Sequence, residues 1–307
     1  MRNFTFKGLL LTAVFMLLGC LSIQAANDDL ITKQITIKLD KAGTLPDRIA
    51  SSKKYKITNL KIVGEINGTD WNMIREMAGR NYQESSTEGN LSVLDLSEAK
   101  IVAGGEYYYY DNLFNNKVYT SNDEIGEYAF AYCSGLTSLT LPVGITSIGE
   151  FAFSGCSGLT SLTLPAGITS IGEYAFYGCS GLTSLTLPAG ITSIGEFAFS
   201  YCSGLTSIYV YAEKVPRIGR YAFEGCASRK CTLYVPKGTY DNYRLSEFGY
   251  FENIVEFDPT GIDKTTTSTD VEEVSRYSLN GQLLVGPTKG LNIVKYSDGS
   301  VKKVAVE

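Results

Sequence analysis

One short unit returns at a fixed spacing through the middle of this 307-residue chain. The hexapeptide from Ile125 to Phe130 recurs, with small changes, at residues 148–153, 171–176, 194–199 and 218–223. The first three steps are 23 residues long and the last is 24. Repeats of this length are typical of solenoids, in which each unit contacts only its neighbours. The repeat therefore predicts the fold class before any other feature is considered.

The unit from Ile145 to Pro165 shows how one turn is built. Its apolar residues end in the pattern Leu159-x-x-Leu162-x-Leu164, whose alternation is typical of a short strand that the following proline ends. A lone unit cannot fold, because its burial is too small to offset the entropy lost in ordering 23 residues. We therefore predict a β-rich solenoid with short strands stacked in a parallel sheet. Its interior should hold one file of phenylalanines: Phe130, Phe153, Phe176 and Phe199.

Looser copies of the strand pattern extend the solenoid in both directions. They begin at Ile57, Leu91 and Leu205, and the second half recurs at Leu233, which gives about seven turns. The spacing between patterns widens to 34 and then 45 residues before the regular repeats begin. We predict that a short helix over 70–78 and a loop over 104–122 fill these insertions.

The amino terminus is typical of a secretory signal peptide. Arg2 and Lys7 precede an apolar run over 8–23, and Ala25-Ala26 offers a small-residue cleavage site. The sequence Leu-Leu-Gly-Cys that ends at Cys20 also resembles a bacterial lipobox, in which this cysteine would be lipidated after cleavage. Both alternatives predict export from the cytoplasm.

The carboxyl-terminal region differs in composition from the repeats. Asp258 to Glu273 is rich in threonine, serine and acidic residues without apolar periodicity, which indicates a linker. Beyond it, Asn280-Gly281 and Asp298-Gly299 are turn signals between alternating strands, so a small β-module is expected.

These patterns divide the chain into five segments. They are a signal peptide over 1–26, an N-terminal cap with irregular repeats and the inserted loop over 27–122, the regular repeats with a C-terminal cap over 123–257, a linker over 258–274, and the β-module over 275–307.

The repeats also carry a resemblance to a known family. The run Ile-Gly-x-Tyr/Phe-Ala-Phe-x-x-Cys-x-x-Leu-Thr-Ser-Leu-Thr-Leu-Pro, clearest from Ile125 to Pro188, resembles the BspA-like leucine-rich repeats of bacterial surface proteins. The resemblance implies a curved, right-handed solenoid of leucine-rich repeats over 57–236. It also implies roles in adhesion or binding at the cell surface.

The tail carries a second resemblance. Its Tyr-x-Leu-x-Gly, Lys-Gly-Leu-x-Ile-Val and Lys-Lys-Val elements resemble the C-terminal sorting domain of type IX secretion in Bacteroidetes-like bacteria. This implies attachment to the exterior of the outer membrane through the sorting domain, with a lipid on Cys20 as the alternative. A small β-module without a sorting role is the other interpretation of the tail.

Composition excludes several classes of function. The chain contains no histidine, so neither a Ser-His-Asp or Cys-His catalytic group nor an imidazole metal site can form. Lysine and arginine are absent from Val118 to Glu213, where seven carboxylates occur. Such a surface cannot track phosphates, so we expect no nucleic-acid partner. We also expect no cofactor and no metal site.

Cysteine follows the repeat in a column of its own. We predict that these side chains fill the core as small apolar residues, because consecutive layers orient them poorly for disulfides. The irregular segment between Cys226 and Cys231 is different, and this pair could form a disulfide outside the cytoplasm. The column consists of Cys133, Cys156, Cys179, Cys202 and Cys226.

A column of glutamates follows the same spacing. One carboxylate per layer does not supply the converging oxygens of a calcium site, and identical layers do not supply two unlike carboxyls for glycoside hydrolysis. We predict a solvated edge consisting of Glu127, Glu150, Glu173 and Glu196.

Two sets of residues are candidates for ligand contact. The first should project from the exposed face of the sheet and consists of Thr140, Thr163, Thr186, Tyr209 and Tyr234. The second interrupts the repeats with flat, hydroxyl-bearing rings and consists of Tyr107, Tyr108, Tyr109, Tyr110 and Tyr119. The alternatives are ordinary strand propensity for the first set and packing over the end of the solenoid for the second.

We predict a non-catalytic cell-surface protein that uses the solenoid as a scaffold to bind a host protein, a matrix component or a glycan. One alternative is a β-solenoid enzyme that acts on polysaccharide, which would need a cleft with a carboxylate pair or a basic residue. The other is a purely structural surface component.

Overall fold

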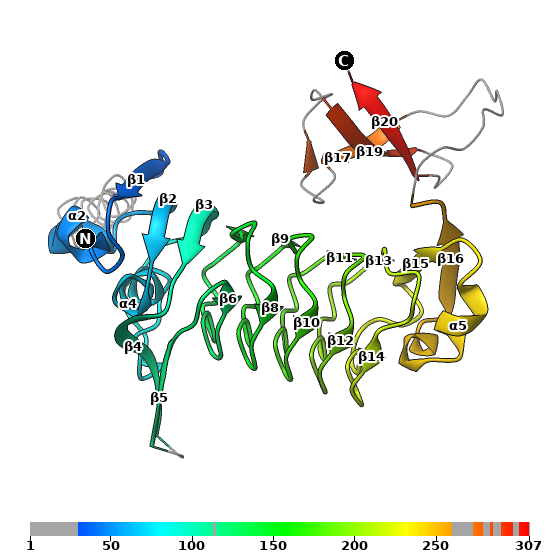
Figure 1. Ribbon diagram of the computed structural model, residues 1–307, viewed down its shortest axis with the longest axis horizontal. Helices are drawn as coiled ribbons and strands as arrows, with labels where there is room; N and C mark the ends of the chain where they lie inside the picture. Colours follow the sequence, from blue (N-terminus) through cyan, green and yellow to red (C-terminus); the bar gives the residue numbers. More distant parts are fainter. Residues whose placement is uncertain are drawn as a thin grey trace, which may run out of the picture.

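Short parallel strands stack along the long axis of the molecule (Figure 1). The computed structural model describes residues 30–112, 115–259, 273–278, 283–284, 290–296 and 301–306. The predicted signal peptide with Cys20, most of the predicted linker, and the turns at 280–281 and 298–299 lie outside the described residues.

The main sheet runs from one end of the solenoid to the other in two hydrogen-bonded parts. All its strand pairs are parallel, and the N–H of Thr183 donates to the carbonyl of Thr160 at 3.4 Å, which joins the two parts. The predicted β-rich solenoid is therefore confirmed. The first part consists of β1 (Ile35–Leu39), β2 (Asn59–Ile66), β3 (Val93–Ile101), β7 (Ser138–Thr140) and β9 (Ser161–Thr163). The second consists of β11 (Ser184–Leu187), β13 (Ser207–Val210), β15 (Thr232–Pro236) and β16 (Asn253–Phe257).

The sheet is longer than the predicted seven or so turns, by one strand at each end. β1 pairs in register with β2, with Ile35 opposite Leu60 and Ile37 opposite Ile62. Neither β1 nor β16 carries the Leu-x-x-Leu-x-Leu spacing, so the search for that pattern missed both. Alternating apolar residues were enough to seat β1 against a strand already in place.

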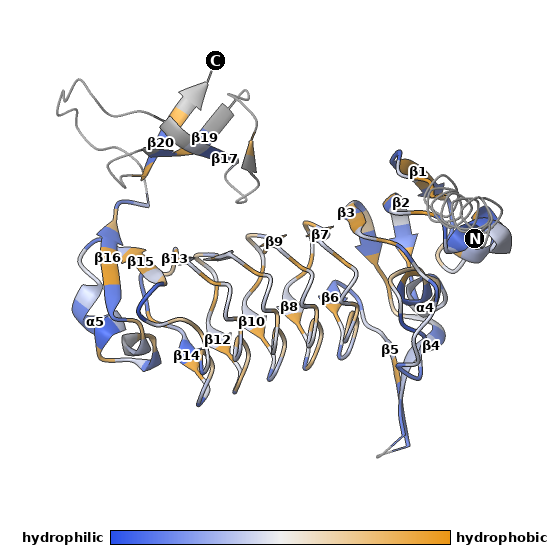
Figure 2. Ribbon diagram, turned by 180° about the vertical axis from the view of Figure 1, so that it is seen from behind, coloured by the Kyte–Doolittle hydropathy of each residue, from blue (hydrophilic) through white to orange (hydrophobic). Residues whose placement is uncertain are grey.

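A second, narrower parallel sheet lines another side of each turn. Its strands have two residues each, and Ile148, Ile171 and Ile194 of three of them point into the core (Figure 2). In spatial order they are β14 (Arg217–Ile218), β12 (Ser193–Ile194), β10 (Ser170–Ile171), β8 (Ser147–Ile148) and β6 (Glu124–Ile125).

The two insertions before the regular repeats fold differently. The first contains the predicted helix, α4 (Gly68–Met77), capped by Asn67 and Asp70 in a capping box. The loop predicted over 104–122 is wrong, because this segment forms an antiparallel hairpin of β4 (Gly104–Asp111) and β5 (Asn116–Thr120). The hairpin forms because Tyr109 of β4 pairs with Val118 of β5 and both side chains are buried.

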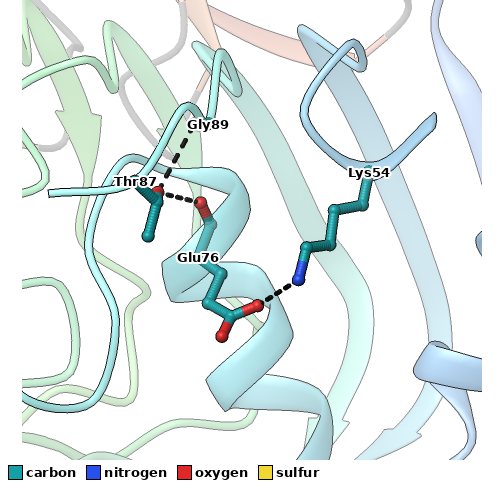
Figure 3. A network of polar contacts seen from close by, with 4 residues as sticks. All are labelled: Lys54, Glu76, Thr87 and Gly89. Atoms are coloured by element: carbon teal, nitrogen blue, oxygen red, sulfur yellow. Dashed lines mark hydrogen bonds and ion pairs between the residues drawn. The ribbon is translucent and has the colours of Figure 1, made fainter. Parts of the chain in front are cut away.

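A small polar network ties α4 to the segments around it (Figure 3). Lys54, the last residue of α3 (Ser51–Lys54), forms an ion pair with Glu76 at 2.5 Å. The hydroxyl of Thr87 donates to the carbonyl of Glu76 at 2.6 Å, and the N–H of Gly89 donates to that hydroxyl at 3.4 Å. A Cβ on Gly89 would lie 2.2 Å from this carbonyl, so the chain needs glycine there to pass the helix end.

The predicted file of phenylalanines is confirmed. Consecutive rings from Phe130 to Phe223 are stacked at 4.9–5.5 Å and are almost fully buried. The file ends on Trp71 of α4, 5.2 Å from Phe130, and on Phe248, 5.1 Å from Phe223. Phe248 belongs to η1 (Glu247–Tyr250), which follows α5 (Tyr240–Arg244) in the C-terminal cap.

A second aromatic file runs beside the first and is half-exposed. Each of its rings sits on a residue with left-handed backbone, with φ between 52° and 58°. That conformation costs about 1 kcal/mol or more per residue, and stacking at 4.8–5.2 Å between successive layers offsets a similar amount. The file consists of Tyr128, Phe151, Tyr174, Phe197 and Tyr221.

The small C-terminal β-module is also present. It is an antiparallel sheet in the order β18-β17-β19-β20. Its strands are β17 (Glu273–Ser278), β18 (Leu283–Leu284), β19 (Gly290–Tyr296) and β20 (Val301–Val306).

The buried file makes a clear prediction for stability. Phe176→Ala removes a ring that stacks on both neighbours, so we expect a loss of about 3–5 kcal/mol in the free energy of unfolding, measured by chemical denaturation. Val143→Ala is the control, because this side chain is 73% exposed and its loss should change stability by less than about 0.5 kcal/mol. Equal effects of the two substitutions would contradict the role of the file.

Candidate functional site

The tyrosine segment lies on β4 and contacts the end of the solenoid. Tyr108 and Tyr109 are buried, with 1% and 6% of their surface exposed, and Tyr107 and Tyr110 are half-buried. These four residues therefore do not form the exposed contact loop that the sequence indicated. Tyr119 on β5 is 48% exposed and is the member of this set that is open to a partner.

The first regular repeat needs a cap because of the direction of its backbone hydrogen bonds. Along the turns, the N–H groups of one layer donate to carbonyls of the following layer, as Phe153 does to Ala175 and Phe176 does to Ala198, both at 2.7 Å. The carbonyls of the first layer have no preceding layer to receive such bonds from. Buried carbonyls without a donor would destabilise this end of the fold.

Side chains from α4 and β4 supply the missing donors. The hydroxyl of Tyr108 donates to the carbonyl of Glu127 at 2.8 Å. The indole N–H of Trp71 and the guanidinium of Arg75 both donate to the carbonyl of Ala129, at 3.0 and 3.1 Å. Burial raises the pKa of Tyr108 well above its ordinary value, which keeps its hydroxyl protonated and able to donate. Tyr108 is therefore a structural cap.

Two arginines complete this cap. Arg75 is fully buried and also donates to the carbonyl of Tyr128. Arg80 donates to the carbonyl of Tyr132 at 3.1 Å. Sequence reasoning missed both arginines and Trp71. The available signal was that the single tryptophan of the chain falls in the helix predicted just before the first regular repeat.

The predicted row of threonines and tyrosines is formed on the main sheet. Thr140 pairs with Thr163 across neighbouring strands, and Thr186 pairs with Tyr209, which pairs with Tyr234. The side chains are half-buried instead of fully exposed. The rings of Tyr209 and Tyr234 stack at 4.4 Å and 5°, so one end of the row presents a flat aromatic surface.

A cavity of about 480 Å³ lies over this row. Its floor includes Thr163, Thr186 and Tyr209, and its opposite side includes Tyr277 and Lys295 of the C-terminal sheet. The cavity walls therefore carry hydroxyls, aromatic rings and one ammonium group.

A groove of about 550 Å³ runs along the second sheet beside the hairpin. Tyr119 and Lys117 line its end, and Glu127 and Glu150 line its side. The predicted column of glutamates is exposed, as expected. Partial burial and the neighbouring charges of Glu173 and Glu127 raise the pKa of Glu150.

The cysteine column fills the core as predicted. Cys133 to Cys226 are buried free thiols, and the thiol of each member after the first lies 3.0–3.2 Å from a backbone carbonyl, as Cys156 does from Phe130. The disulfide considered between Cys226 and Cys231 is not formed in the structure, where both are buried free thiols. Burial raises the pKa of Cys231 to about 12.

Two searches of the described residues found no further site. Neither the solenoid nor the described strands of the C-terminal sheet bring together three or more metal-ligating side chains. None of the helices in the described segments is long and apolar enough to cross a membrane.

Comparison with known proteins identifies the repeats. Residues 103–239 match the BspA type leucine-rich repeat region in six copies. The resemblance inferred from the sequence is therefore confirmed for this region. No curated protein sequence matches the chain. No comparison bears on the sorting domain, which stays a prediction.

Several solved structures are similar to this chain over part of its length. A leucine-rich repeat protein of T. pallidum is 30% identical, with a TM-score of 0.37, over 45% of this chain and 63% of that one. One from Bacteroides ovatus is 26% identical, with a TM-score of 0.28, over 38% and 42%. A leucine-rich cell surface protein from Faecalibacterium prausnitzii is 21% identical, with a TM-score of 0.25, over 65% and 51%. The chain thus spans roughly half to two thirds of the length of these proteins.

The cap predicts a specific loss of stability. Tyr108→Phe keeps the buried ring but leaves the carbonyl of Glu127 without its donor, so we expect the free energy of unfolding to fall by about 1–3 kcal/mol. Tyr119→Phe is the matched control on the same hairpin, with a side chain 48% exposed and little expected effect. Both are measured by urea denaturation, and a Tyr108→Phe variant as stable as the control would refute the capping role.

The glutamate column predicts a pH-dependent effect. The raised pKa of Glu150 means that the folded state favours its protonated form, so stability is lost as pH rises through that pKa. Glu150→Gln should raise the denaturation midpoint at neutral pH, and the gain should disappear in acid, where the carboxyl is already neutral. Glu213→Gln, exposed and outside the column, should show neither effect. A gain that persists unchanged in acid would count against charge repulsion as the cause.

Proposed function

We propose that this protein is a non-catalytic binding scaffold on the cell surface, where it adheres to a host protein, a matrix component or a glycan. The BspA type repeats of residues 103–239 support this role, since one structurally similar protein is described as a cell surface protein. Export through the amino-terminal signal and attachment by a lipid or by the sorting-like module are parts of the same proposal.

The observation that carries the proposal is the row of hydroxyls and rings on the main sheet. Thr140, Thr163 and Thr186 repeat at the spacing of the strands and lead into the stacked pair Tyr209 and Tyr234. Threonine hydroxyls both donate and accept hydrogen bonds, and flat aromatic rings pack on sugar rings or apolar side chains. A regular row of shallow contacts suits an extended partner, and display of many copies on a surface increases the avidity.

The enzyme alternative has less support. Catalysis on polysaccharide would use two carboxyls in unlike surroundings across a cleft. The exposed carboxylates of the repeats instead lie in one column of similar layers, from Glu127 to Glu196. A purely structural role would be indicated if the mature protein bound no ligand.

Binding assays on the mature full-length protein test the proposal. Matrix proteins and a glycan array are screened with the wild-type protein and with a variant that carries Thr163→Glu and Thr186→Glu. Two buried-edge charges on the row should weaken binding at least about tenfold. The matched control carries Thr146→Glu and Thr169→Glu, which lie at exposed positions beside the second sheet.

The outcomes separate the surfaces. Equal binding by wild type and the sheet variant would overturn the assignment of the row. In that case Tyr119→Ala tests the groove beside the hairpin, and the structural effects of Tyr108 and Tyr109 do not complicate the result. Turnover of a polysaccharide that is lost on changing one carboxylate would replace the binding role with the enzymatic one.

A further inference from the structure

The two ends of the solenoid differ in how their backbone groups are satisfied. At the N-terminal end, side chains of Trp71, Arg75 and Tyr108 donate to the carbonyls of the first regular layer. At the other end, the last regular layer runs from Arg217 to Cys226, and no equivalent set of side chains meets its backbone along the described chain.

The last layer leaves a row of backbone donors open. In the layer before it, Phe197, Phe199 and Tyr201 donate to the carbonyls of the following layer at 3.1, 2.8 and 2.6 Å. The equivalent N–H groups of the last layer belong to Tyr221, Phe223 and Gly225. By the repeat geometry they point toward the C-terminal cap, yet within the described residues none of the three donates to an acceptor.

The same layer leaves two carbonyls open. β14 is the edge strand of the second sheet, and its inner neighbour β12 receives bonds on Thr192 from Arg217 at 2.9 Å and on Ile194 from Gly219 at 2.8 Å. The equivalent carbonyls of the last layer belong to Pro216 and Ile218, and no N–H of the described chain donates to them.

The side chain of this edge is open as well. Ile218 is only half-buried, whereas the isoleucines at its position in the four preceding layers are at most 2% exposed. An apolar side chain placed over Ile218 would therefore bury surface that the chain leaves exposed.

Two adjoining hollows lie at these open groups. One, of about 580 Å³, is lined by Pro216, Ile218 and Leu245, and the other, of about 310 Å³, is lined by Tyr221 and Phe223. They share a wall formed by η1. The fully buried Phe248 of η1 already fills the next place in the core file, so the space left open is along the backbone edge.

We infer that this end of the solenoid binds an extended polypeptide segment, which adds to β14 as a further parallel strand. Two N–H groups of the segment would donate to the carbonyls of Pro216 and Ile218, and one carbonyl would accept from Tyr221. Edge strands bind extended peptides in this way, with affinity from the main chain and specificity from alternate side chains. The inference does not depend on the proposed adhesive role.

The geometry also specifies the segment. In the last layer, a Cβ on Gly219 would lie 2.3 Å from the backbone N of Glu196, so successive layers need glycine where they cross. The bound segment needs glycine at the equivalent place, over Arg220, preceded by an apolar residue to cover Ile218. A second copy cannot dock end to end, because Trp71, Arg75 and Tyr108 already occupy the carbonyls it would offer.

The test uses a peptide taken from the chain itself. Residues 190–197, Gly-Ile-Thr-Ser-Ile-Gly-Glu-Phe, have the backbone pattern that pairs with the next layer inside the solenoid. Hydrogen–deuterium exchange of the mature full-length protein is followed with and without saturating peptide. We expect the amides of 217–226 to exchange at least about tenfold more slowly with peptide.

Two controls make the result decisive. A peptide with valine in place of its second glycine should give no protection, because its side chain would meet the backbone of Arg220. Leu245→Glu, on the rim of the larger hollow and 78% exposed, should weaken the protection, whereas Val143→Glu, 73% exposed on a distant turn, should not. Protection that is absent, lies elsewhere, or is equal for both peptides would overturn the inference.

Discussion

Hydrogen bonding between successive layers is the constraint on which the rest of this structure depends. Each turn of the regular repeat has strands of only two to four residues, too short to be stable alone. Layers become stable because each donates to the next along both sheets and the turn, and because the phenylalanine file closes the space between them. The invariant spacing of 23 residues follows from this, since a changed length would misalign donors and acceptors.

A structure held together in this way has to solve the problem of its ends. The two faces of a layer are not equivalent, because one offers carbonyls and the other N–H groups. The chain satisfies the carbonyl face with the indole of Trp71, the guanidinium of Arg75 and the phenol of Tyr108. The N–H face is covered over the core by Phe248 but not along the backbone edge. This asymmetry is the physical basis for the peptide site inferred at the C-terminal end.

The repetition that stabilises the fold also shapes its surface. Any residue type fixed at one position of the unit becomes a straight column, whether it is buried like Cys156 or exposed like Glu150. Columns of hydroxyls and rings suit partners that are themselves extended, and they do so without a deep pocket. The half-exposed aromatic file shows that the chain accepts left-handed backbone at Phe151 and Tyr174 to keep its rings stacked.

The sequence by itself determined the solenoid, the buried files of phenylalanine and cysteine, the helix near 70–78 and the register of Thr140 with Thr163, because each follows from a local period repeated in neighbouring layers. Only the tertiary structure decided the role of the tyrosine segment, which depends on which backbone groups of the first layer lack partners. It also placed β1 and β16, whose own patterns are weak and which pair only because a finished edge is waiting for them. Periodic contacts can be read from spacing, whereas the ends of a repeat depend on contacts between segments that share no period.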